Sequence, residues 1–530
     1  MNFLRPIAFA AACTVAAVAH AGVAIEGTGR GVDSLSRTTA EKMVVEPGGL
    51  GHVQLIPYFG THAGNATLFA ITNQDEVNGK VLKVRFRSAG NGDTVFDFTL
   101  FLGAGDSWSA NVSQGASGVA QLVTADTSCT LPAISRLDFN TAELPPATAQ
   151  FTAADRDLWT REGFVEIINA ADIPPTLNAA GRAGQENPMF RAIDVVAADG
   201  PPPCASSPNG SAAMGALATD VSNEADAVAK GLDTPSGLIS VWAMLMNVQN
   251  AYLSWGIEGT ALGAVDAQGR PGRGRLVVSP QTADAVETGR ASALTADALI
   301  TQGRLVARQY HFPDLSTPCR AGSASAAPFD QATAAGLAMA ATQFSNQYSA
   351  APNINSMTDL VVTQPMKRYF VGFDYQGASD ADRLVFPRAN GFYRAASTQV
   401  SGNRACSRFS ADTTAYGKAF DRSGRRIGDQ PTGPVTIGFL PFGLAMSCGG
   451  TTNYNINGGP DFSLLKSPKS LRQSFFTSFQ EGWVRIDTPG AGTGVPLIGL
   501  SFSSAVGAPV AGMSTNFGWA VKHKTVPYRP

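Results

Sequence analysis

The chain has 530 residues, of which 39 are lysine or arginine and 41 are aspartate or glutamate, so its formal net charge is −2. Charged residues make up 15% of the sequence and hydrophobic residues 44%, against about 25% charged residues in average soluble domains. A chain of this length and hydrophobic content is expected to form about two to four packed domains. The near-zero charge argues against nucleic-acid binding and against an acidic solvating tail as the main role.

The N-terminus has the pattern of a secretory signal peptide. Arg5 precedes an apolar run, Ile7–Val18, and Ala-His-Ala at 19–21 supplies the small residues that a signal peptidase requires. We expect cleavage after residue 21 and an exported mature chain. The apolar run is too short to span a bilayer. Lipid attachment at Cys13 is the less favoured alternative, because the large aliphatic residue usual before such a cysteine is missing.

The segment after residue 50 has an antiparallel β pattern. Lys83, Arg85 and Arg87 alternate with leucine, valine and phenylalanine, and Phe96–Leu100 repeats the alternation with polar partners. This period of two is typical of half-buried strands. Ala89–Asp93 contains the glycine and asparagine residues of a hairpin loop. We expect the cationic face to point to solvent or to form salt bridges across the sheet.

Composition changes later in the chain suggest connectors between β regions. Prolines interrupt the strand pattern at 201–203, and the segments 282–301 and 331–345 are alanine-rich with helical spacing. The uncharged stretch Leu238–Ile257 holds three central amides, which would be costly in hydrocarbon, so we interpret it as two buried strands. No transmembrane segment is therefore expected in the mature chain.

These observations predict a mainly β fold, with two antiparallel β-sandwich-like domains and an alanine-rich helical connector and insertion. We divide the chain into the signal peptide 1–21, an N-terminal extension 22–44, β domain 1 at 45–204, a connector 205–236, and β domain 2 at 237–527 with a helical insertion at about 281–350. Glu162–Ile167 and Glu481–Ile486 share the pattern Glu-Gly-aromatic-Val-charged-Ile. This echo indicates two related domains, with convergent strand patterning as an equal alternative.

The cysteines fit an exported protein. Beyond the signal peptide the chain has no C-x-x-C pair and no metal-ligand spacing with histidine, so we expect disulfides. We favour Cys129–Cys204 and Cys406–Cys448, because each pair lies within one expected domain. Cys319 is then left over, either as a quiet thiol or for an intermolecular bridge. Sequence does not determine the connectivity, and other pairings stay open.

No residue pattern predicts catalysis, a metal or a cofactor. The chain has no G-x-S-x-G, H-E-x-x-H or Walker A motif. His52 and His62 lack further zinc ligands and are interpreted as ordinary strand or loop residues. The neighbouring carboxylates of Asp155 and Asp157, like those at 380 and 382, fit helix starts or solvated loops better than a glycosidase pair. A Ser-His-Asp triad from distant positions stays open.

Two loops have compositions that suit ligands. Arg270, Arg273 and Arg275 lie in one glycine-rich turn and could clamp sulfate, phosphate or an acidic polysaccharide, although a solvated hairpin loop is the favoured interpretation. The asparagine-rich stretch Thr451–Asp461 lacks the carboxylate spacing of a calcium loop, so we expect a plain loop there.

Seven segments of the chain have a recognisable sequence, at residues 55–59, 65–69, 83–87, 160–168, 358–371, 482–487 and 496–500. Together they resemble a family of exported proteobacterial proteins that are described as cell-surface or hypothetical proteins. It is collinear and spans most of the mature chain. It implies export and a β-rich fold, and it implies no activity, cofactor or catalytic residue.

The leading hypothesis is a non-enzymatic exported protein at the cell surface or in the periplasm, with a structural or adhesive role through loops and strand edges. Partners would be surface polysaccharide or other envelope proteins, with no nucleic acid and no cofactor. One alternative is a carbohydrate- or small-ligand-binding β module with a cleft near Trp108, Trp159 or Trp255. Another is a secreted hydrolase with an unrecognised site.

Overall fold

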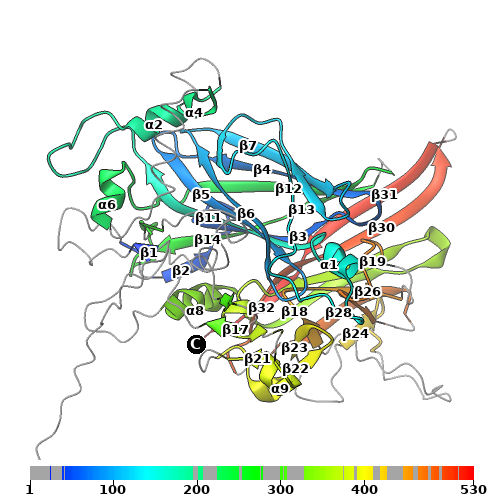
Figure 1. The fold of residues 1–530 in the computed structure, drawn as a ribbon. Helices are drawn as coiled ribbons and strands as arrows, with labels where there is room; N and C mark the ends of the chain where they lie inside the picture. Colours follow the sequence, from blue (N-terminus) through cyan, green and yellow to red (C-terminus); the bar gives the residue numbers. More distant parts are fainter. Residues whose placement is uncertain are drawn as a thin grey trace, which may run out of the picture.

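The fold is described from a computed structural model of the chain, shown in Figure 1. The structure describes residues 24–25, 39–40, 42–194, 201–206, 224–249, 253–274, 276–277, 299–301, 304–306, 328–373, 375, 377–386, 391–409, 418–426, 446–457, 463–475, 479–488, 492–510 and 513–529. The expected signal peptide at 1–21 and Cys319 lie outside these residues.

The first half of the chain forms a sandwich of two antiparallel sheets. One sheet has the order β10 (Arg136–Asp138), β8 (Ala120–Val123), β7 (Ser107–Gln114), β4 (Asn65–Asn73), β12 (Ile239–Asn247) and β13 (Ser254–Ile257). The other has the order β2 (Lys42–Val45), β14 (Thr260–Val265), β3 (Val53–Gly60), β11 (Glu162–Ile173), β5 (Gly79–Ser88), β6 (Thr94–Leu102) and β9 (Cys129–Leu131). We call this pair of sheets the first sandwich.

The alternating residues of the first sandwich form its core. Phe86 of β5 packs against Phe69 of the facing sheet, and Phe98 of β6 packs against Trp108, with ring centroids 5.6 and 5.3 Å apart. Phe96 lies beside Phe86 and Phe98 in the β5–β6 hairpin, at 6.1 and 5.7 Å. All five side chains are buried. The predicted hairpin is therefore present, and its apolar face closes the sandwich because aromatic rings at alternate positions point to the same side.

The second half forms a similar sandwich. One sheet has the order β27 (Arg472–Phe475), β26 (Thr451–Ile456), β19 (Met357–Thr363), β30 (Ile498–Val510) and β31 (Met513–Lys522), with a parallel pair only at β26–β27 within the described residues. The other contains β24 (Lys418–Asp421), β28 (Glu481–Asp487), β18 (Ala340–Ser349), β29 (Val495–Pro496) and β32 (Lys524–Pro527). We call these sheets the second sandwich. Together with the first they confirm the predicted mainly β, sandwich-like fold.

Short elements surround the two sandwiches. The strands are β1 (Ala24–Ile25), β15 (Leu276–Val277), β16 (Leu299–Thr301), β17 (Arg304–Val306), β20 (Gly372–Phe373), β21 (Leu384–Val385), β22 (Thr398–Ser401), β23 (Arg404–Arg408) and β25 (Met446–Cys448). The helices are α1 (Ala153–Trp159), α2 (Pro188–Ile193), α4 (Pro203–Ser206), α6 (Glu224–Ala229), α8 (Pro328–Met339) and α9 (Asp380–Arg383), with 3₁₀ turns η1 (His62–Gly64), η3 (Pro352–Ile354), η4 (Lys367–Tyr369) and η5 (Ala395–Ser397).

Two expected segments differ from the structure. The strands β12, β13 and β14 were expected to open the second domain, but they pair with β4, β2 and β3 and complete the sheets of the first half. The expected helix at 331–345 ends at Met339, and β18 follows at once. Phe344 and Tyr348 of β18 are buried in the core, because a strand places alternate residues on one face.

Eight strands of the first sandwich have a counterpart in the second. Neighbours β7, β4, β12 and β13 of the first sandwich correspond to β26, β19, β30 and β31 of the second. Neighbours β14, β3, β11 and β5 correspond in the same way to β32, β18, β28 and β24. The corresponding strands also follow one another in the same order along the chain. The chain therefore contains one topology twice.

Two details fix the register of the repeat. The Thr67 hydroxyl accepts from the N–H of Gly60 (3.0 Å) and donates to its carbonyl (3.2 Å), and Thr358 makes the same two contacts to Ser349 (3.0 and 2.9 Å). In addition, β11 begins at Glu162, opposite Gly60, and β28 begins at Glu481, opposite Ser349. Both copies of the sequence echo therefore occupy the same place in their sandwiches.

The sandwiches meet through backbone as well as side chains. The N–H groups of Gly450 and Thr451 donate to the carbonyl of Ala89 at 3.1 and 3.2 Å. Gly449 next to them has a φ of +75°, and a Cβ there would overlap the carbonyl oxygens of Ala89 and Gly90. Only glycine therefore fits this junction. Each of the two core clusters contains residues of both halves, so the cores are continuous across the contact.

Among the described residues, no helix has the length and apolar character needed to cross a membrane.

Candidate functional site

The best candidate for a functional site is a row of polar residues between the two sandwiches. We call this row the polar seam; it runs from Asp93 and Arg368 through Arg87 and Glu166 to Glu162, Ser467 and His62. At one end Arg368 donates to Asp93 at 2.6 Å, and the Tyr375 hydroxyl donates to the other oxygen of the same carboxylate at 2.5 Å. Asn91 donates to Tyr375 at 2.9 Å and accepts from the N–H of Ala405 at 2.9 Å. The loop of the β5–β6 hairpin is thus fastened to the second half.

The cationic face of β5 forms the middle of the polar seam. Lys83, Arg85 and Arg87 are all buried, which corrects the expectation that they face solvent. Arg87 donates to one oxygen of Glu166 at 2.8 and 3.0 Å and to the Tyr369 hydroxyl at 3.2 Å, so the expected salt bridge across the sheet is present. Burial, with the charge of Arg85, holds the pKa of Lys83 well below its usual range.

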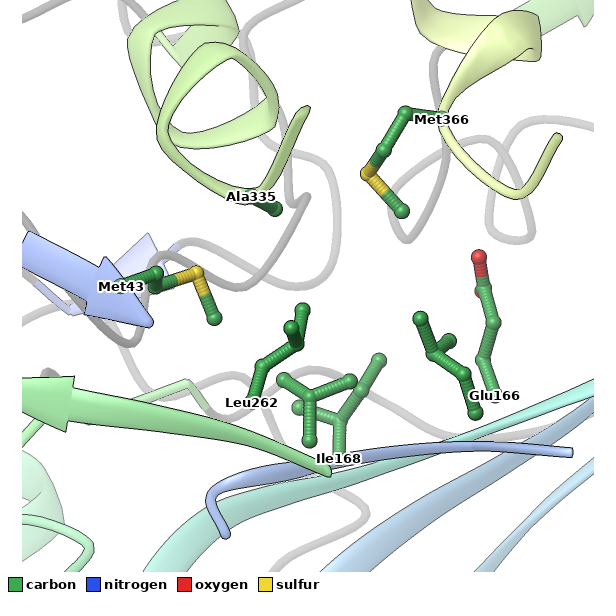
Figure 2. Close-up of a pocket in the computed structure, with 8 residues that line it drawn as sticks. Met43, Glu166, Ile168, Leu262, Ala335 and Met366 are labelled. Carbon is green, nitrogen blue, oxygen red and sulfur yellow. The ribbon is translucent and has the colours of Figure 1, made fainter. Parts of the chain in front are cut away.

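A small cavity lies beside Glu166, as Figure 2 shows. It is lined by Met43, Val53, Leu55, Glu166, Ile168, Leu262, Ala335 and Met366 and has a volume of about 10 Å³, which is about what a single water molecule requires. Figure 2 places Ala335 and Met366 above the sheet residues. The second oxygen of Glu166 has no hydrogen-bond partner among the described residues. This space is mostly apolar and holds at most one water molecule.

A serine, a histidine and a carboxylate meet at the other end of the polar seam. The Ser467 hydroxyl donates to Glu162 at 2.6 Å, and Nε2 of His62 lies 3.4 Å from the same oxygen. In a hydrolytic triad the imidazole lies between the serine and the acid, whereas here the acid lies between the other two. All three side chains are buried. Burial, together with the charge of Glu162, raises the pKa of the neighbouring Tyr58 well above its usual value.

The other described histidines are structural. His52 accepts from the N–H of Ala264 at 3.1 Å and donates to the carbonyl of Pro235 at 3.2 Å. His523 accepts from Asn346 at 2.9 Å and donates to the carbonyl of Val361 at 2.9 Å. Burial lowers the pKa of each to about 4. Neither histidine contacts a serine hydroxyl, and His311 lies outside the described residues.

The arginine-rich turn does not form a joint anion site in the described residues. Arg270 binds Asp266 at 2.7 Å, and Arg273 reaches inward to Asp172 at 3.3 Å and Asp233 at 3.7 Å. Arg275 lies outside the described residues. The two described guanidinium groups are therefore directed to carboxylates of the chain itself.

A buried lysine completes the network that Arg273 enters. The Lys80 ammonium donates to Asp75 and Asp172 at 2.7 Å each and to the Ser236 hydroxyl at 2.8 Å. Burial alone would raise the pKa of Asp75, but the charge and hydrogen bond of Lys80 outweigh it and hold that pKa below its usual range. The network joins β5, β11 and the 233–236 segment inside the first half.

The tryptophans considered for a ligand cleft are buried. Trp108, Trp159 and Trp255 are at most 2% exposed. Trp159 donates to the Ser470 hydroxyl at 3.2 Å, and Trp255 donates to the carbonyl of Ser503 at 2.8 Å. These rings serve the core and the contact between the sandwiches, and none of the three is open to a ligand.

The carboxylate pairs lie at helix starts, as interpreted from the sequence. Asp155 forms a capping box with Thr152 at the start of α1, and Asp382 forms one with Ser379 at the start of α9. The stretch expected to be a plain loop from residue 451 is in fact the buried strand β26 up to Ile456. Residues 458–462 lie outside the described part.

Both favoured cysteine pairs are within disulfide distance. The Cα atoms of Cys129 and Cys204 lie 6.1 Å apart, and those of Cys406 and Cys448 lie 3.9 Å apart. The second pair joins directly opposed positions of β23 and β25. Both bridges stay within one half of the chain, and neither crosses the polar seam.

Sequence reasoning missed most of the polar seam. Asp359 is fully buried and accepts from Ser463, Asn453 and the N–H of Leu465, yet it lies in a strand with no motif around it. Burial, opposed by these hydrogen bonds, raises its pKa. The only sequence signal was charge at alternate positions of apolar strands. Within the described residues no group of three or more His, Cys, Asp or Glu side chains is arranged to hold a metal ion.

Comparison of the chain with protein-family models, with curated proteins and with solved structures found no match.

Proposed function

We propose that the chain is an exported, non-catalytic structural or adhesive protein of the bacterial cell surface or periplasm. The observation that carries the proposal is the polar seam, in which the side chains best suited to chemistry hold the two sandwiches together. Ser467 and His62 both contact Glu162, and all three side chains are buried. Two cysteine pairs at disulfide distance support an oxidising compartment. The resemblance to exported cell-surface proteins supports the same location.

Deletion of the gene in the source bacterium tests this role. We expect weaker surface attachment or lower envelope resistance to detergent, restored by the wild-type gene. The Ser467→Ala variant should restore both to within about twofold, because loss of one hydrogen bond to Glu162 costs only about 1–3 kcal/mol. Secretion of the chain should be measured in the same strains by fractionation.

Two results would count against the proposal. Unchanged attachment, biofilm and detergent resistance in the deletion strain would remove the structural or adhesive role. Failure of a normally folded and exported Ser467→Ala protein to complement would favour the hydrolase alternative instead.

A further inference from the structure

The flank of the first sandwich is covered by the second sandwich. This flank is the row Leu253, Trp255 and Ile257 along β13. Trp255 is 1% exposed, donates to the carbonyl of Ser503 at 2.8 Å, and packs edge-on against Phe502 with ring centroids 6.3 Å apart. Figure 1 shows β30 and β31 running beside β13. An apolar flank is thus removed from water inside the molecule.

The corresponding flank of the second sandwich is open. In the first sandwich, the register leads from Thr67 of β4 through Leu245 of β12 to Trp255 of β13. In the second sandwich, it leads from Thr358 of β19 through Ser503 of β30 to Trp519 of β31. Because Thr67 and Thr358 are equivalent, Trp519 is the counterpart of Trp255. The same register makes Phe517 and Val521 the counterparts of Leu253 and Ile257. Phe517, Trp519 and Val521 are 57%, 40% and 41% exposed.

The surface that covers the first flank also has an open counterpart. Leu500 and Phe502, on the outer face of the β19–β30–β31 sheet, are fully buried against the first sandwich. Their equivalents on the first sandwich are Trp242 and Met244, at the same register positions of β12. Trp242 is 55% exposed and Met244 is partly exposed. The molecule therefore ends with an open flank on one sandwich and an open outer face on the other.

Two charged residues at the edge of the contact between the first flank and its covering sheet also have equivalent positions in the repeat. Inside the molecule Glu258, next to the first flank, pairs with Lys522 of the covering sheet at 3.2 Å. By the register, Lys522 is itself the counterpart of Glu258. A second copy placed on the open flank would therefore bring its Glu258 to Lys522, an attractive pair with the two roles exchanged.

We propose that copies of this chain associate head to tail. The outer face of the first sandwich of one copy, with Trp242 and Met244, covers the open flank of the second sandwich of the next copy, with Phe517, Trp519 and Val521. The two surfaces differ, so the contact is heterologous and leaves a free surface at each end for further copies. Large exposed apolar rows of this kind mark interaction sites in soluble proteins. The inference stands on the repeat alone and does not depend on the proposed function.

Sedimentation velocity of the full chain from residue 22 tests the association. We expect species larger than the monomer that grow with concentration up to about 100 µM, in the range of transient contacts. A flank variant (Phe517→Ser with Trp519→Ser) and a face variant (Trp242→Ser) should each raise the dissociation constant at least about tenfold, because aromatic anchors dominate interface energies. The matched control is Val77→Ser, which changes a 60% exposed valine elsewhere.

Mixing the two variants gives the decisive result. Each keeps one intact surface, so an equimolar mixture should form a one-to-one dimer and nothing larger, with the affinity of the wild type. Circular dichroism and the melting temperature must match the wild type for each variant, and Phe517→Thr with Trp519→Thr offers a second flank variant of higher strand propensity should serine destabilise β31. A wild type that stays monomeric, variants that associate normally, or a mixture that stays monomeric would each overturn the proposal.

Discussion

Replacement of Gly449 by alanine is expected to destabilise the protein by about 2–5 kcal/mol. The positive φ contributes about 1–2 kcal/mol of this loss for any residue with a Cβ, and overpacking adds about 1–3 kcal/mol. The overlap is with the carbonyl oxygens of Ala89 and Gly90, which are main-chain atoms that cannot rotate away. Urea unfolding of the purified mature chain measures the change.

Gly402 offers a matched control. It also has a positive φ, of +60°, but a Cβ there would meet nothing within 4 Å. Gly402→Ala should therefore cost only about 1–2 kcal/mol, the conformational part alone. Equal losses at both positions would show that the junction between the sandwiches is not tightly packed at Gly449, contrary to the structure.

Acidification from pH 8 to pH 5 is expected to destabilise the fold by about 4 kcal/mol through two histidines. Burial lowers the pKa of His52 and His523 to about 4, whereas an unfolded histidine titrates near 6.5. The unfolded state therefore binds the extra protons, so stability present above pH 6.5 is lost as the pH falls toward 4. Each histidine contributes about 2 kcal/mol of this loss at pH 5.

The slope of the unfolding free energy against pH separates the titration of these two histidines from that of other groups in the chain. Near pH 5 the unfolded state binds more protons than the folded state. His52→Gln and His523→Gln should each reduce this difference in bound protons by about one. Their stability at pH 8 falls, because the buried imidazole contacts are lost, but the slope is independent of that offset. An unchanged slope in both variants would refute the assignment. Should the glutamine variants fail to fold, NMR titration of the folded wild-type chain tests the assignment directly, and imidazole signals of His52 and His523 that titrate near 6.5 would refute it as well.

Local patterns in the sequence predict local features of this fold well. The alternation around Arg85 places the β5–β6 hairpin, Thr152 and Asp155 form the cap that starts α1, and Cys406 meets Cys448. Each of these features depends on residues that are close in sequence or on the compartment of the protein. Periodicity and capping chemistry are sufficient for such predictions.

Features that depend on the contact between distant segments were not predictable in this way. Lys83, Arg85 and Arg87 have the pattern of a solvated face but are buried, and Tyr369 of the second half contacts Arg87. Similarly, Ala340 and Ala341 suggest a helix, yet they open β18, because pairing with β29 and β32 overrides a weak helix propensity. Nothing local in a strand shows what covers its second face.

The repeat explains why the first half extends to Val265. The predicted boundary followed composition, whereas the topology requires β12, β13 and β14 to complete the first sandwich, as β30, β31 and β32 complete the second. The six-residue echo at Glu162 and Glu481 was the only sequence sign of this duplication, because register and strand order repeat far more closely than the residues do.

The polar seam and the shared cores are expected to make the two sandwiches one cooperative body. Differential scanning calorimetry of the mature chain tests it most directly. One transition is predicted, with a calorimetric enthalpy equal to the van't Hoff enthalpy, as for a single two-state unit. Two separate transitions, or a van't Hoff enthalpy about half the calorimetric value, would contradict it, because each sandwich would then unfold independently of the other.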